Sequence, residues 1–163
     1  MLQSVSSFVS YFEGIRRRTL NYIKAVPQDR LDWSPREGEF TCRQIILHLA
    51  ITEKLFVGGF IDGKWKYGDS NAGGGSLDEV IDYLNRTHTE SMAALSAIGD
   101  GELNQPRPTL DGPTIKAWRL LMMLVEHEVH HRSQLAMYLF LMGVQPPHIF
   151  GMGIEDVIAR ATG

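Results

Sequence analysis

Two histidines one helical turn apart are the first feature of this sequence that could do chemistry. The chain contains six histidines, and His127, His130 and His131 fall within five positions. Because an α-helix turns about 100° per residue, side chains four positions apart lie nearly on one face. His127 and His131 should therefore point the same way, at a spacing that lets both imidazoles reach one metal ion. His130 projects about 100° away from His131 and is expected at the edge of that face.

The helix face that carries this pair is otherwise largely apolar. Its expected members are Leu120, Leu124, His127, His131, Gln134 and Tyr138. Two imidazoles buried on such a face need partners for their ring nitrogens, which favours metal ligation over a purely structural role.

A histidine also interrupts a second apolar segment, where His48 shares a helix face with Ile45, Thr52 and Leu55. A single buried histidine is more often a hydrogen-bonded core residue than a ligand. Together with the pair, however, it makes three neutral imidazoles from two helices. Such a set leaves coordination positions of a divalent ion open, which is typical of catalytic sites. Imidazole suits Zn²⁺, Ni²⁺ and Fe²⁺ alike, so the ligands do not select among these metals.

Residues 127–131 also satisfy the H-E-x-x-H pattern of zinc peptidases, in which Glu128 would activate water. The metzincin continuation is absent, since Gln134 stands where glycine is required and Met137 where histidine is required. Glu155 could supply a third ligand only from a short tail, and no strand is evident to hold a peptide. A zinc peptidase is therefore the weaker alternative.

Helical patterns in four long segments must position these side chains. We expect helices over residues 2–26, from residue 41 to the glycine pair at 58 and 59, over 76–98 and over 113–142, with a short helix over 154–161. Thr41 with Gln44, and Ser76 with Glu79, form capping boxes. No segment shows the alternation of a strand. The sequence thus predicts one all-α domain over residues 1–163, a four-helix bundle.

Two stretches between these helices read as loops. Residues 68–76 are rich in glycine but lack the ending of a phosphate-binding loop, so we interpret them as a linker. Residues 99–112 form a second loop, and loops of this length allow connections other than simple hairpins.

Composition limits the classes of partner. The chain has 16 Lys and Arg against 19 Asp and Glu, which argues against nucleic acid or an anionic membrane as the main partner. No uninterrupted apolar run approaches the ~18 residues of a membrane span, and no secretory signal is evident. The single cysteine excludes a Cys-rich zinc site and fits a reducing compartment. We expect a cytoplasmic protein that acts on a small molecule.

Several other polar residues are expected to have no chemical role. His88 lies among polar neighbours and is predicted to be exposed, and His148 is predicted in a loop. Cys42 is expected to be buried in a first helical turn and not to be a nucleophile. The arginine run 16–18 is interpreted as a solvated helix face.

Two sequence blocks resemble the DinB/YfiT-like superfamily of metal-dependent enzymes. The first comprises residues 31–35, 40–41 and 45–50 with Glu53, and the second comprises residues 127–135. The second block is similar to the H-x-x-x-H-R-G-Q pattern of the family, with Ser133 in place of the usual glycine. The resemblance implies an up-down-down-up four-helix bundle whose metal is bound by His48, His127 and His131.

The resemblance also implies an activity. Several branches of the family look like thiol S-transferases that use a low-molecular-weight thiol, or related isomerases, and members are often homodimers. For this chain we expect a thiol S-transferase or a hydrolase that acts on a small molecule. In such a site Glu128 is a candidate base, although an outer-shell or surface position is equally compatible with its place on the helix. Gln134 is a candidate for a hydrogen bond to a ligand or substrate, and Arg132 for a structural salt bridge. The alternative from another class is a non-catalytic binding or stress-response module in which the metal only holds helices together.

Overall fold

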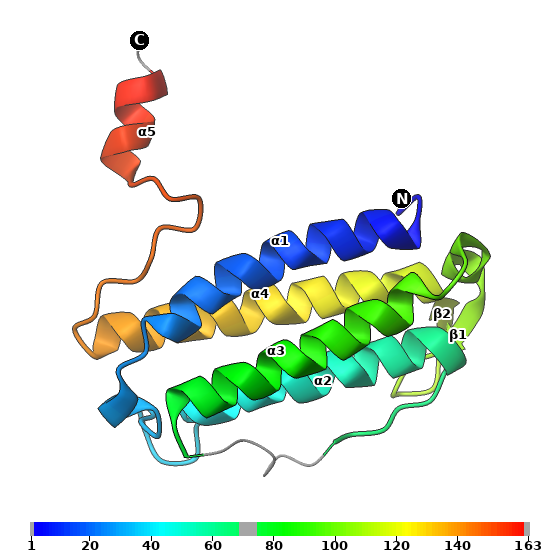
Figure 1. Cartoon of the computed structure of the whole chain (residues 1–163), viewed down its shortest axis with the longest axis horizontal. Coiled ribbons are helices and arrows are strands. Elements are labelled where there is room, and N and C mark those ends of the chain that lie inside the picture. The colour runs from blue at the N-terminus through cyan, green and yellow to red at the C-terminus, as the bar shows by residue number, and fades with distance from the viewer. Residues whose placement is uncertain (1, 69–74, 162–163) are drawn as a thin grey trace.

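The computed structural model describes residues 2–68 and 75–161 and is dominated by four long helices (Figure 1). These are α1 (Val5–Lys24), α2 (Cys42–Asp62), α3 (Leu77–Ser96) and α4 (Ala117–Leu141). The shorter elements are the 3₁₀ turns η1 (Gln28–Arg30) and η2 (Asp100–Asn104), the strands β1 (Pro106–Pro108) and β2 (Thr114–Lys116), and α5 (Ile154–Ala161). The expected all-α bundle is confirmed, with one small hairpin added.

The helices run in the predicted up-down-down-up order. In Figure 1, α1 and α4 run in one direction and α2 and α3 in the other. Helix α2 packs against α3 and α4, and α1 packs against the same two helices. Because α2 and α3 are parallel, their connection must travel the length of the bundle, which explains the long predicted linker. Residues 69–74 of that linker lie outside the described residues.

Helix starts follow the predicted capping chemistry. Both capping boxes form: the Thr41 and Ser76 side chains accept from the backbone N–H three residues later, and the Gln44 and Glu79 side chains accept in return. These boxes fix the first turns of α2 and α3. The residues downstream, including His48, therefore keep a defined helical phase.

The glycine pair does not end α2, contrary to expectation, and the helix continues to Asp62. A Cβ atom on Gly59 would lie 2.9 Å from the Trp65 side chain, so this glycine serves close packing of the returning chain. The helix ends instead at Gly63, whose φ of 73° is left-handed. The chain then turns back along the outer side of α2.

The predicted loop 99–112 and the predicted start of the fourth helix were partly wrong. Residues 106–116 form an antiparallel hairpin that pairs Pro106 with Lys116, and α4 begins only at Ala117. Strands of three residues are too short to show a two-residue alternation, which is why the sequence pattern missed them. The hairpin is anchored by Arg107, which donates to the carbonyl oxygens of Phe60 and Ile61 at the end of α2.

The bundle interior contains two apolar clusters separated by a charged layer. One cluster surrounds Ile46, Leu84 and Leu135, and the other surrounds Phe12 and Leu121. Between them each helix contributes one ionisable side chain to this layer: Arg16, Glu53, His88 and Glu128. The Arg16 Nη2 atom lies 2.5 Å from Glu53 Oε2 and 3.2 Å from Glu128 Oε2. Arg16 is only 2% exposed, so the prediction that the whole arginine run faces solvent was wrong for its first member.

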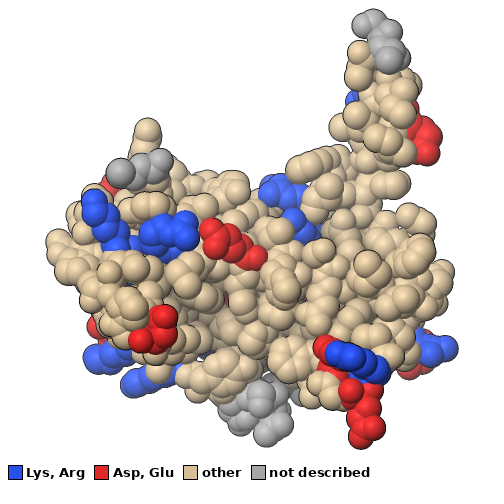
Figure 2. Space-filling view, turned by 180° about the vertical axis from the view of Figure 1, so that it is seen from behind, with Lys and Arg blue, Asp and Glu red and all other residues tan. Residues whose placement is uncertain are grey.

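The outer surface carries charges of both signs. On the side formed by α2 and α4, seen from behind in Figure 2, basic and acidic side chains lie near one another rather than in a patch of one sign. Helix α5 projects away from the bundle, and none of its residues is buried (Figure 1). By length and composition alone α2 could cross a membrane, but 67% of its most apolar window is buried inside the bundle.

Candidate metal centre

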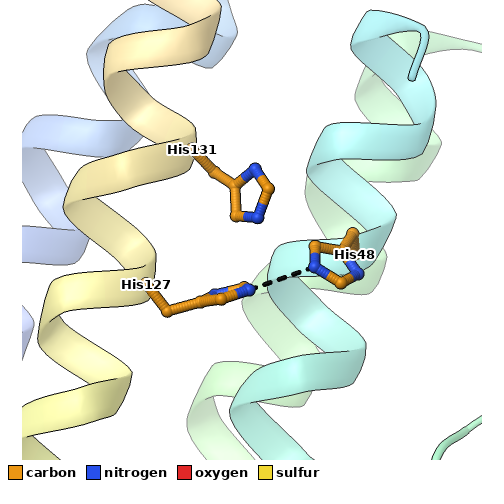
Figure 3. Close-up of side chains that lie close together, drawn as sticks. All are labelled: His48, His127 and His131. Carbon is orange, nitrogen blue, oxygen red and sulfur yellow. Dashed lines mark hydrogen bonds between the residues drawn. The ribbon is translucent and has the colours of Figure 1, made fainter. Parts of the chain in front are cut away.

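Three imidazoles from two helices face one another between α2 and α4 (Figure 3). His48 comes from α2, and His127 and His131 come from successive turns of α4. One nitrogen of each ring lies within 4.8 Å of one nitrogen of each of the others. His48 Nε2 and His127 Nε2 lie 3.0 Å apart. Three nitrogens bound to one Zn²⁺ at ~2.0–2.1 Å lie about 3.3 Å apart in a tetrahedron, so the observed spacing is close to that of a metal site.

The outer nitrogen of every ring in this group has its own partner. His48 Nδ1 lies 3.2 Å from the Tyr67 hydroxyl, and His127 Nδ1 lies 3.4 Å from the Thr52 hydroxyl. His131 Nδ1 lies 2.9 Å from Gln134 Oε1. Ligating histidines in proteins characteristically use the second ring nitrogen in this way, which fixes the orientation of the ring.

These partners assign the tautomers of the two α4 imidazoles. Gln134 Oε1 can only accept, so His131 carries its proton on Nδ1. The Thr52 hydroxyl donates to the His48 carbonyl oxygen at 2.6 Å, so its oxygen accepts from His127 Nδ1. Both rings therefore present an unprotonated Nε2, the form that can bind a metal. In this structure the His48 Nε2–H donates to His127 Nε2. When the His48 proton moves to Nδ1, where it faces the Tyr67 hydroxyl oxygen, His48 also presents an unprotonated Nε2.

The three rings are held in the neutral state. Burial, followed by the charge of His131, lowers the pKa of His48 to about 4. Burial, followed by the neighbouring histidines, lowers the pKa of His127 to about 3. Burial also lowers the pKa of His131, and the hydrogen bond to Gln134 only partly opposes this. At neutral pH no net proton has to be released before a cation binds, although the His48 proton must move from Nε2 to Nδ1.

Acidification from about pH 6 to about pH 5 is expected to destabilise the metal-free protein. His48 and His127 have pKa values below the ordinary 6.5, so the unfolded chain binds more protons than the folded chain in this window. Their contribution to stability is present above pH 6.5 and is lost as the pH falls. The midpoint of urea unfolding measures the effect. The control is His127→Ala, whose midpoint should fall less between about pH 6 and about pH 5 because one of the two titrating imidazoles is removed. A midpoint that rises on acidification would contradict the assignment of neutral rings.

Of the two candidate catalytic residues, the structure brings only Gln134 to the histidine cluster. Gln134 bonds to His131 and donates from Nε2 to the Tyr138 hydroxyl at 3.2 Å. Glu128 points the other way, into the charged layer beside Arg16, and is 1% exposed. Its carboxylate is therefore a core ion-pair partner, not a surface group or a base beside the three imidazoles.

Arg132 does not form the predicted salt bridge, since no carboxylate within the described part of the chain pairs with it. Burial lowers the pKa of its guanidinium. One guanidinium nitrogen, Nη1, is buried without a hydrogen-bond partner.

The prediction that His88 is exposed was wrong. His88 is buried, and its Nδ1 lies 3.0 Å from Glu53 Oε2. Polar sequence neighbours suggested exposure, but His88 shares the inward face of α3 with Leu84 and Leu95. Burial lowers the pKa of His88, but the hydrogen bond to Glu53 and the charge of that carboxylate outweigh it, so that the net shift is upward.

The other minor predictions hold. His130 is exposed at the edge of the site, with its ring 4.9 Å from that of His131. His148 lies in the irregular segment before α5. Cys42 is fully buried, and burial raises the pKa of its thiol to about 11, which excludes an easily formed thiolate.

One site residue was not predicted from the sequence, and another was predicted only in position. Thr52 was expected on the helix face of His48, one turn further along, but its contact with His127 was not expected. Tyr67 comes from the chain that returns along α2, 19 residues after His48, and no local spacing rule connects the two.

Comparison with known proteins places this chain in a family. Residues 11–135 match the sequence profile of the DinB superfamily. The uncharacterised protein YjoA of Bacillus subtilis is 24% identical over 146 residues, which cover 88% of this chain and 93% of YjoA. A DinB-like protein from Bacillus cereus has a similar structure, with a TM-score of 0.74 at 20% identity over 91% of this chain and 99% of that one.

A second solved structure carries a functional description. YfiT from Bacillus subtilis, described as a probable metal-dependent hydrolase with an unusual four-helix bundle topology, superimposes with a TM-score of 0.65. It is 19% identical, and the match covers 86% of this chain and 89% of YfiT. At this identity the likeness establishes the shared bundle, in agreement with the up-down-down-up order seen here. Profile match and fold together show that this chain belongs to the DinB superfamily.

Proposed function

We propose that His48, His127 and His131 bind one divalent metal ion through Nε2, and that the protein is a metal-dependent enzyme acting on a small molecule. The observation that carries the proposal is that the two nitrogens of each ring have different surroundings. Every Nδ1 has a hydrogen-bond partner outside the cluster, while the other nitrogens of the three rings lie close to one another. A set of histidines buried only for packing has no need of such convergence. Zn²⁺, Ni²⁺ and Fe²⁺ all suit three neutral imidazoles.

A divalent ion on three imidazoles supplies Lewis acidity, which lowers the pKa of water or a thiol towards ~7 and creates a nucleophile at neutral pH. The protein contributes orientation and environment. Tyr67, Thr52 and Gln134 hold the three rings in place, and burial keeps the rings neutral. Glu128 takes no part in proton transfer, because its carboxylate faces Arg16 on the other side of α4.

Hydrolysis and thiol transfer both begin with such a nucleophile, so the two reactions are the candidates for this site. The hydrolase is supported by the description of YfiT, and the transferase, with a low-molecular-weight thiol as cosubstrate, by the family resemblance. The deciding experiment is a turnover screen of the zinc-, nickel- and iron-loaded protein with activated esters and with small thiols plus electrophilic acceptors. Ester cleavage without thiol identifies a hydrolase, and thiol consumption that requires an acceptor identifies a transferase. No turnover with any metal favours the non-catalytic alternative.

Removal of the metal tests that alternative directly. The bundle has two apolar clusters that need no metal, so a chelator is expected to lower the melting temperature by about 5–10 °C while the helical circular dichroism at room temperature is kept. A module held together by its metal would instead lose its helical signal when the metal is removed.

Loss of the Gln134 side-chain amide is expected to weaken metal binding. Gln134→Leu removes the acceptor that fixes the His131 tautomer, and outer partners of this kind contribute at least about tenfold in affinity. Competition with a fluorescent zinc chelator measures the change. Gln145→Leu, at an exposed position after α4, is the matched control and should bind as the wild type does. Equal affinities of the two variants would show that the Gln134 contact does not orient the ligand.

A further inference from the structure

A small pocket opens directly beside one of the three imidazoles. It has a volume of about 210 Å³ and is lined by Phe40, Gln44, Leu47, His48, Ile51 and Tyr67. At ~30 Å³ per water this equals about seven water molecules, which is below the usual size of sites for drug-sized ligands. The pocket therefore fits one ring or a branched chain of similar size.

Aromatic groups form two walls of this pocket. The Phe40 ring lies 5.3 Å from the His48 ring, and the Tyr67 ring lies 6.4 Å from it on the chain that returns along α2. Both aromatic side chains are exposed, at 41% and 58%, although each touches the candidate metal centre. Such rings gain most from the contact with a flat apolar group.

Among the residues that the structure describes, no charged side chain lines the pocket. In this described lining, the polar residue besides His48 and Tyr67 is Gln44, and its Oε1 atom already accepts from the Thr41 backbone in the capping box. Gln44 is neutral and its amide nitrogen is a donor. An anionic group held between these lining side chains would find no cationic side chain among them to pair with.

We propose that this pocket holds the body of the substrate, and that the substrate is an uncharged molecule carrying one aromatic or branched apolar group. This inference rests on the proposed metal-dependent function, because the pocket is defined by its position beside His48. It goes further by predicting that the group held in this pocket is neither a carboxylate nor a phosphate. It also gives Phe40 and Tyr67 a role in specificity.

Paired hydroxamates test the proposal on the zinc-loaded protein. Acetohydroxamic and benzohydroxamic acid share one zinc-binding group and differ in a methyl against a phenyl group. The phenyl compound is expected to bind at least about tenfold more tightly in calorimetric titration. 4-Carboxybenzohydroxamic acid should lose most of this advantage. The proposal is overturned if the three compounds bind equally, or if none binds a protein that holds zinc.

Variants of the pocket test whether Phe40 and Tyr67 cause the preference for the phenyl compound. The double variant Phe40→Leu with Tyr67→Leu should reduce the phenyl preference to about threefold or less, whereas Tyr67→Phe keeps the ring and should keep the preference. Phe140→Leu, at an exposed aromatic residue of α4 outside the pocket, is the matched control. A preference that survives the double variant would place the aromatic subsite elsewhere and refute the assignment.

A metal-independent measurement separates this inference from the proposed function. In the metal-free protein, benzyl alcohol should shift the methyl resonances of Leu47 and Ile51, while ethanol at the same concentration should not. If the protein binds no metal but these shifts appear, the proposed function fails and the pocket preference stands. If zinc binds and the shifts are absent, the pocket assignment fails and the metal site stands.

Discussion

The double variant His127→Ala with His131→Ala is expected to contain no stoichiometric metal, whereas the wild-type protein should hold about one ion per chain. The variant removes two of the three inner nitrogens and leaves His48 alone. Zinc sites with four ligands gain ~10–16 kcal/mol, roughly 3 kcal/mol per ligand, so this loss should weaken binding by at least about a thousandfold. Elemental analysis after dialysis against metal-free buffer measures the content.

The neighbouring histidine provides the control for this experiment. His130→Ala lies within the same five residues, but His130 is exposed and makes only an edge contact with His131. It should retain the full metal content. Unchanged metal in the double variant would exclude the three-histidine site, and loss of metal in His130→Ala would show that a fourth imidazole takes part. Circular dichroism of each variant verifies that the bundle is intact.

Local spacing explains why so much of this site was predictable. His127 and His131 had to share a face because both lie on one uninterrupted helix, and the Thr41–Gln44 capping box set the phase of the helix that carries His48. That the two helices would adjoin came from the family resemblance, since periodicity alone does not choose neighbours in a bundle. The predicted homodimer and cytoplasmic location stay predictions.

The features that were missed depend on contacts between distant parts of the chain. Tyr67 reaches His48 only because Gly59 lets Trp65 pack closely and turn the chain back along α2. Arg16 looked like the first of three solvated arginines, and His88 like one polar residue among others. Each is buried because the other helices supply Glu53 and Glu128 as partners at the same level of the bundle. A pattern within one helix carries no information about such partners.

The charged layer between the two apolar clusters should be the most sensitive point for stability. Arg16→Met keeps much of the side-chain volume but leaves Glu53 and Glu128 buried without their cation. Breaking a buried ion pair on one side costs about 3–5 kcal/mol, because the remaining charge stays out of water. The free energy of unfolding from urea titration at neutral pH measures this cost. Arg17→Met, next in sequence but exposed, should change it by less than about 0.5 kcal/mol.

The pH dependence of this loss distinguishes an uncompensated charge from poor packing. In the wild-type protein burial raises the pKa of Glu53, but Arg16 and the hydrogen bond from His88 outweigh it, so that the net shift is downward. Without Arg16 we expect the pKa of Glu53 to lie above its ordinary value. A raised folded-state pKa favours folding below the unfolded-state value and opposes it as the pH rises. The difference between Arg16→Met and the wild type should therefore shrink from about pH 7 to about pH 4, whereas a packing defect would leave it constant.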